Sequence, residues 1–258
     1  MTNAISRLGR AVLARIAALG KAGIYLGVVV AWIFVPPYRP RRIVDELSNI
    51  GARSVFVVIV VGAFTGGVLA MQGYRSLRSY GAIGLLGATV SISLVRGAGP
   101  VLAAFLIAAR AGSSIAARIG TMRITEQLDA LEVMALHPLK YIAVPNLIAG
   151  VIAFPLLTGV FDLAGYAGGY MASVWVLGVD KGTFLAGMNS GVTLADVWQG
   201  FMKSLVFAVL VIWVCTYKGF RVRRGAEGVS RATTEAVVTS VVVLIVFDYM
   251  LTSMGVFR

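Results

Sequence analysis

Apolar runs long enough to cross a bilayer constrain this chain more than any other sequence feature. Residues 54–74 and 141–161 are each twenty-one residues long and contain no Asp, Glu, Lys or Arg. Three more runs carry only a few charges: 79–109, 197–217 and 229–257. A transmembrane helix needs about 20 apolar residues. Hydrophobic residues make up 59% of the chain and charged residues 13%. The sequence therefore predicts an all-α membrane protein with five transmembrane helices, as one domain over 1–258 with its five-span core at 54–257.

Basic residues are concentrated in the segments that one side of the membrane would carry. Most of the 23 Lys and Arg residues fall before the first run, between the second and third, and between the fourth and fifth. The positive-inside rule then places the N-terminus in the cytoplasm and the C-terminus on the outer side. A nucleic-acid-binding protein would gather such charges on one folded face with aromatic neighbours, so the net charge of +12 does not indicate nucleic acid.

The N-terminal segment, 1–53, predicts an interfacial elbow rather than a sixth span. Its apolar residues recur at helical spacing between arginines, which is typical of an amphipathic helix lying on the membrane surface: Ile5, Leu8, Val12, Ile16 and Leu19. The apolar run 22–35 is too short to span, and we expect it to be re-entrant, turning back at Pro36-Pro37. A cleaved signal peptide is the alternative, but charges run to Lys21 and no cleavage site of small residues precedes the prolines.

Small residues in the predicted spans indicate close helix packing. Gly62 and Gly66 form a GxxxG pair, as do Gly165 and Gly169. In lipid, helices associate through close backbone approach, which small side chains permit. The stretch 97–100, Gly-Ala-Gly-Pro, predicts a bend in the second span because proline removes a backbone hydrogen bond.

Three ionisable residues inside the spans need partners, because an unpaired charge in the membrane is costly. Lys203 and Asp248 lie at matching depths on antiparallel spans, so we expect a structural ion pair between them. Arg96 lies near the middle of the second span, and no acid is evident at its depth. It therefore faces a wet cavity, an anionic ligand or backbone carbonyls.

Catalytic signatures are missing from the sequence. It has no GxxxxGK[ST] phosphate loop, no GxSxG elbow and no HExxH motif. A single His137 and a single Cys215 give neither a metal cluster nor an internal disulfide. We predict no enzyme, no cofactor and no metal site. A transporter without an ATP-binding motif of its own must use a separate ATPase or an ion gradient. For coupling to a gradient, the spans offer only Asp162 and Asp248.

An acidic stretch, TEQLDALEVMALHPLKY at 125–141, separates the second and third runs. Read as a helix, it carries an apolar stripe on one side, with Glu126 and Asp129 on the other: Ile124, Leu128, Leu131 and Ala135. Such a cytoplasmic helix suits docking into an ATPase groove. A solvated connector explains the pattern equally well.

The run RAGSSIAARIGTMRITEQLDALEVMALHPLKYIAVPNLIAG resembles the signature of the MlaE/YrbE permease family. GGVLAMQGY, MKSLVFA, GVSRATTEAVV and FDYMLT are similar to further family motifs. The resemblance implies the homodimeric membrane subunit of an MCE-type ABC transporter in a bacterial inner membrane. It also implies a separate ATPase on the cytoplasmic face, a hexameric MCE-domain ring on the periplasmic face and, in some systems, a small STAS-type subunit. The implied cargo is phospholipid, moved between inner and outer membranes.

The resemblance also implies site residues. Lipid would bind at the dimer interface, near Leu69, Leu77, Tyr80, Arg96 and Gly97. The region 112–136 would be the coupling region that receives ATPase motion, through Arg118, Glu126, Asp129, Leu131, Glu132 and Met134. An ATP-independent channel or secondary transporter, or a scaffold anchoring an MCE ring, are the alternative functions.

Two acids of the family pattern are absent. The usual Arg-Glu-Leu-Gly-Pro has glycine at Gly97, and the usual Ala-Glu-Ile-Gly has arginine at Arg118. We expect the first change to make the lipid cavity more positive and more accepting of anionic head groups. We expect the second to make the coupling region more basic and to be matched by an acidic edge on the ATPase.

Overall fold

The computed structural model describes residues 2–35, 40–223 and 225–253, and every regular element in those ranges is helical. The α-helices are α1 Thr2–Ile33, α2 Pro40–Ile50, α3 Val55–Ser79, α4 Leu86–Ser93, α5 Gly99–Ile107, α6 Ser113–Ile124, α7 Gln127–Val133, α8 Val144–Tyr170, α9 Lys181–Gly191, α10 Leu194–Phe220 and α11 Ala226–Ser253. The prediction of an all-α protein is confirmed.

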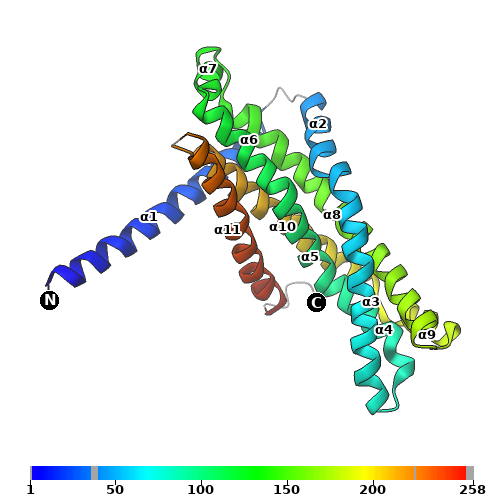
Figure 1. The fold of residues 1–258 in the computed structure, drawn as a ribbon. Helices are drawn as coiled ribbons and strands as arrows, with labels where there is room; N and C mark the ends of the chain where they lie inside the picture. The colour runs from blue at the N-terminus through cyan, green and yellow to red at the C-terminus, as the bar shows by residue number, and fades with distance from the viewer. Residues whose placement is uncertain (1, 36–39, 224, 254–258) are drawn as a thin grey trace.

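Five helical stretches in these ranges are long and apolar enough to cross a membrane, as the charge-free runs predicted. They are Pro40–Ser79, Ile83–Ile124, Leu139–Val176, Leu194–Phe220 and Ala226–Ser253. Residues 254–257 of the predicted fifth span lie outside the described residues. The first three stretches hold about 40 residues each, or about 60 Å of helix, which is twice the hydrocarbon thickness. Their ends therefore project beyond the hydrocarbon layer. α2 and α7 lie at one end of the bundle and α9 at the other (Figure 1).

The second span is one helical path with two wider turns. π-Helical turns at Leu94–Ala98 and Ala108–Gly112 join α4 to α5 and α5 to α6. Pro100 follows in the first turn of α5, where its missing N–H is tolerated. A π-turn thus lies next to the position where the bend was predicted, and the bend itself stays a prediction. The third span has π-turns at Leu139–Ala143 and Met171–Val176, on either side of α8.

The two GxxxG pairs face each other across α3 and α8, which lie side by side (Figure 1). A Cβ added to Gly62 would lie 2.7 Å from the carbonyl oxygen of Phe161, and one on Gly66 would overlap the backbone of Gly165. The predicted close packing through these glycines is confirmed. α9 approaches α4 in the same way, because a Cβ on Gly87 would overlap the backbone of α9.

α9 begins with a side-chain cap. Asp180 precedes the helix, and its carboxylate accepts hydrogen bonds from the backbone N–H and the hydroxyl of Thr183, at 2.8 and 3.0 Å. These bonds lower the pKa of the Asp180 carboxyl, because they stabilise its charged form.

α1 is a single helix that continues through both predicted parts of the N-terminal segment and extends away from the bundle (Figure 1). Its apolar part, Gly20–Ile33, is too short to span. This part contacts the bundle: Val29 is buried, and Trp213 of α10 donates a hydrogen bond to the carbonyl of Ala22 at 2.9 Å. The predicted amphipathic stripe, Ile5 to Leu19, and the turn at Pro36-Pro37 lie outside the described side chains and residues.

Candidate functional site

The predicted lipid-binding residues of α3 differ in exposure. Leu69 and Leu77 are half-buried and pack against the core, whereas Tyr80 is 85% exposed. A separate apolar stripe on α3 is strongly exposed at four-residue spacing, formed by Phe56, Val60, Phe64 and Val68. Phe64 is 74% exposed. α3 therefore presents an apolar face that the rest of the described chain does not cover.

Arg96 has a carboxylate partner, contrary to the expectation that no acid lies at its depth. Its guanidinium forms an ion pair with Asp196 in the first turn of α10. Asp196 is fixed in turn because its other oxygen accepts hydrogen bonds from the backbone and the hydroxyl of Thr193, both at 2.8 Å. The Asp196 side chain is 2% exposed and that of Arg96 is 53% exposed. The Arg96 charge is therefore paired within the chain. The expected effect of glycine at position 97 on the lipid cavity stays a prediction.

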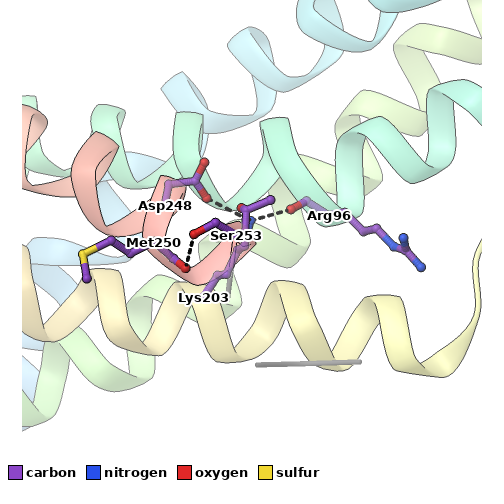
Figure 2. Close-up of polar contacts among 6 residues, drawn as sticks. Arg96, Lys203, Asp248, Met250 and Ser253 are labelled. Atoms are coloured by element: carbon purple, nitrogen blue, oxygen red, sulfur yellow. Dashed lines mark hydrogen bonds and ion pairs between the residues drawn. The ribbon is translucent and has the colours of Figure 1, made fainter. Parts of the chain in front are cut away.

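Lys203 and Asp248, the expected pair, lie together between α10 and α11. The ammonium nitrogen of Lys203 is 2.9 Å from Oδ1 of Asp248, and it also donates to the hydroxyl of Thr252 at 2.9 Å. A third bond, 3.1 Å long, reaches the backbone carbonyl of Arg96 (Figure 2). Lys203 is buried, at 2% exposed, whereas Asp248 is 28% exposed and Thr252 lies at the surface of the chain. α10 thus binds the side chain of Arg96 through Asp196 and its carbonyl through Lys203.

Two glycines in and next to the turn around Arg96 differ in the space beside their Cα atoms. A Cβ on Gly97 would meet nothing within 4 Å, whereas one on Gly99 would overlap the carboxylate of Asp162 from α8. That carboxylate packs directly on the Gly99 backbone, and its buried Oδ1 has no hydrogen-bond partner among the described residues. The space beside Gly97 is therefore free, while Gly99 is required for Asp162 to fit.

The predicted coupling helix is broken into two shorter pieces. α6 ends at Ile124, Glu126 has a left-handed φ of 58°, and α7 covers only Gln127–Val133 before Ala135 takes the same φ. Ile124 and Ala135 thus lie on no common helix with Leu128. The predicted four-residue apolar stripe is therefore wrong, and only Leu128 and Leu131 share a helix. Leu128 is buried and Leu131 packs against the core.

Two of the predicted coupling residues are held within the chain. Arg118 forms an ion pair with Glu46 of α2 at 2.7 Å and reaches the side-chain oxygen of Asn146 at 3.3 Å. Glu46 thus supplies an acid to Arg118 within the chain. The acidic edge expected on an ATPase stays a prediction. Asp129 accepts a hydrogen bond from Arg123 at 2.8 Å. Both of these side chains are exposed.

This segment exposes two apolar side chains and two acids. Val133 is 89% and Met134 is 69% exposed, and Glu126 and Glu132 are exposed as well. We call these four residues the coupling surface. It projects at the end of the bundle shared with α2 (Figure 1).

Glu46 and Asp196 are the ion-pair partners of predicted site residues that sequence reasoning missed. Asp196 had a usable signal: Thr193 three residues before it forms a capping box in the structure, which fixes the carboxylate at a helix start. Glu46 had none, because its partner lies 72 residues away on another helix. In the described ranges, no group of three His, Cys, Asp or Glu side chains is placed to hold a metal ion.

Five helical stretches long and apolar enough to cross a membrane, packed through glycines and joined by ion pairs, make this chain a multi-pass membrane protein. The family model described as Permease MlaE matches residues 43–254, and this chain belongs to that family. It is 38% identical to the intermembrane phospholipid transport system permease protein MlaE of Haemophilus influenzae, over 98% of this chain and 97% of that protein. It is 35% identical to a probable ABC transporter permease protein of Rickettsia bellii, over 98% of each. The chloroplastic protein TRIGALACTOSYLDIACYLGLYCEROL 1 of Arabidopsis thaliana is 29% identical, over 89% of this chain and 66% of that protein. The resemblance read from the motifs is confirmed.

Proposed function

We propose that this chain is the permease subunit of an ABC transporter that moves phospholipid between the inner and outer membranes of a bacterium. The observation that carries the proposal is near full-length similarity to a phospholipid transport permease, on a chain with five helical stretches long and apolar enough to cross a membrane. The exposed apolar face of α3 supports it, because acyl chains or another apolar helix would cover such a surface. As a non-catalytic membrane component, the chain requires a separate ATPase.

The ATPase would dock on the coupling surface. Exposed apolar side chains together with exposed acids suit a groove on a partner protein, and the left-handed residues at 126 and 135 give the segment a defined shape. Substituting both Val133 and Met134 with Asp should abolish co-purification of the ATPase. The matched control is Val176→Asp, which alters a 66% exposed valine at the far end of the third span. Retention of the ATPase by the double variant would exclude this surface.

The proposal places the coupling surface, and therefore the N-terminus, in the cytoplasm and the C-terminus in the periplasm. Cysteine labelling tests this orientation in a Cys215→Ser background, since Cys215 is the chain's single cysteine. A membrane-impermeant maleimide should label Asp180→Cys in intact spheroplasts and Glu126→Cys only after permeabilisation. The reverse pattern would invert the topology.

ATPase motion would reach the lipid site through the ion pair between Arg118 and Glu46. The pair ties α6, which precedes the coupling surface, to α2, which leads into α3. Nucleotide-driven motion would then shift the population between a wide and a narrow arrangement of α3, expelling lipid. Arg118→Ala should leave ATPase binding intact and reduce ATP-dependent transfer of fluorescent phospholipid between liposomes. Arg123→Ala, which breaks an exposed pair, should have little effect, and equal transfer by both variants would refute this route.

Two copies of the chain would enclose the lipid, with Leu69, Leu77, Tyr80, Arg96 and Gly97 at the interface. A hexameric MCE-domain ring would sit on the periplasmic end, and a small STAS-type subunit could join the ATPase. A cysteine at Phe64, on the exposed stripe of α3, should form a disulfide between copies. A cysteine at Leu163 of α8, which is 69% exposed, is the control, and cross-linking no stronger than this control would place the interface elsewhere.

A further inference from the structure

A cavity of about 350 Å³ lies where α1, α2, the loop after α7 and the start of the third span meet. It is at the end of the bundle that carries the coupling surface, whereas Tyr80 ends α3 at the opposite end (Figure 1). Its lining is mainly apolar, formed by Trp32, Val35, Ile43, Ala135, Leu136, His137, Lys140, Tyr141, Val144, Pro145 and Ile148. The proposed transport site does not use it.

Cationic groups and aromatic rings surround this cavity. The ammonium nitrogen of Lys140 lies 5.4 Å from the centroid of the Trp32 ring, and the imidazole of His137 lies 4.9 Å from the same ring. The guanidinium carbon of Arg42 lies 3.6 Å from the centroid of the Tyr141 ring, and Arg42 also donates a hydrogen bond to the Tyr141 hydroxyl. Among the lining residues that the structure describes, none is Asp or Glu. The described lining therefore carries the cation Lys140 and no acid, and Arg42 lies against the lining residue Tyr141.

The position of the cavity places it at the membrane boundary. The charge-free run of the third span begins at Tyr141, directly after Lys140. Arg42 lies at the same level, because its guanidinium packs on the Tyr141 ring. The apolar lining residues Val144 and Ile148 follow one and two turns deeper into the third span. A ligand here would meet positive charge at head-group level and apolar side chains below it.

We propose that this cavity binds one anionic phospholipid, with its phosphate at Arg42 and Lys140 and the upper part of an acyl chain against Trp32 and Ile148. Clustered basic side chains at a membrane boundary attract anionic lipid, and an apolar pocket with a few polar groups fixes its orientation. The bound lipid connects α1 to the loop at residues 135–137, which follows the coupling surface directly. It would thus be a resident lipid that stabilises this surface, distinct from the transported molecule.

Quenching of Trp32 fluorescence tests this site without any ATPase or transport. The chain has four tryptophans, and the substitutions Trp175→Phe, Trp198→Phe and Trp213→Phe leave Trp32 as the only one. In nanodiscs, phosphatidylglycerol brominated on its acyl chain should quench Trp32 more strongly than phosphatidylcholine with the same chains. If the triple variant does not fold, the difference between the natural chain and Trp32→Phe reports the same quantity.

Charge variants decide whether the proposed contacts cause the preference. The double variant Arg42→Gln, Lys140→Gln should raise the fraction of phosphatidylglycerol needed for half-quenching about tenfold. The control removes two exposed charges from the far end, with Arg75→Gln and Lys181→Gln, and should keep the preference. Equal quenching by the two lipids, or a preference unchanged in the double variant, would overturn the proposal. Loss of the preference on adding millimolar glycerol 3-phosphate would also overturn it, because the site would then recognise a soluble phosphate ester.

Discussion

Replacing Lys203 with methionine removes the charge at the centre of the cluster that joins α10, α11 and the Arg96 turn. The substitution keeps the length of the side chain but leaves Asp248 without its 2.9 Å ion pair and the Arg96 carbonyl without its donor. Lys203 is 2% exposed and Asp248 is 28% exposed. After the substitution, water therefore solvates the Asp248 carboxylate only in part. Breaking one side of a buried pair costs about 3–5 kcal/mol. We expect Lys203→Met to lower the free energy of unfolding by about that amount.

The double variant Lys203→Met, Asp248→Leu separates pairing from simple loss of packing. Replacing both charges with apolar groups is often neutral, so the remaining cost is the unbonded Arg96 carbonyl, about 1–3 kcal/mol. The double variant should therefore be more stable than Lys203→Met alone, even though it carries an additional substitution.

Unfolding in mixed detergent micelles by titration with sodium dodecyl sulfate, followed by circular dichroism, measures these differences. Lys181→Met, at an exposed lysine, is the control and should change stability by less than about 0.5 kcal/mol. The reasoning is refuted if Lys203→Met matches this control. It is also refuted if the loss of stability in the double variant equals the sum of the losses caused by Lys203→Met and Asp248→Leu separately, because the effects of independent residues add.

Three further predictions concern the packing and the α9 cap. Gly66→Ala should cost about 1–3 kcal/mol, because its methyl would overlap the α8 backbone, whereas Gly67→Ala, with 3.6 Å to its nearest neighbour, should be tolerated in the same micelle titration. Gly99→Ala should displace a buried α8 carboxylate and lower the thermal unfolding temperature, and an unchanged temperature would contradict the overlap. Asp180→Ala should destabilise the protein above pH of about 4, where the natural carboxylate is charged and bonded to Thr183. Because its folded-state pKa is lowered, this stabilisation should disappear as the pH falls through that pKa, so the two proteins should converge in acid.

Much of the architecture could be predicted from the sequence because the membrane leaves few alternatives. Backbone groups in lipid must bond within the helix, so an uncharged run of sufficient length can be little else. Depth along antiparallel helices was enough to bring Lys203 and Asp248 together, because helical rise is constant. The four-residue spacing of the glycines on α3 and α8 predicted their close packing for the same reason.

The partners of Arg96 and Arg118 could not be predicted in this way. Asp196 and Glu46 lie 100 and 72 residues from them, at helix positions where an acid usually serves as a cap or faces solvent. The break in the coupling segment could not be predicted from the sequence. The helical spacing of apolar residues applies only while the backbone keeps the negative φ of an α-helix. A glutamate at 126 gives no sequence sign of the left-handed conformation that it adopts.

The π-turns give the second span a property that an uninterrupted α-helix lacks. A π-turn holds more backbone than an α-helical turn. If it tightens to α geometry, the winding of the helix changes by about one residue, which corresponds to a rotation of about 100°. α5 lies between two such turns, at 94–98 and 108–112, so it can rotate about its axis while α4 and α6 keep their orientation. A push along the helix from the end that carries α7 could thereby be converted into a change in the direction that the Arg96 side chain faces.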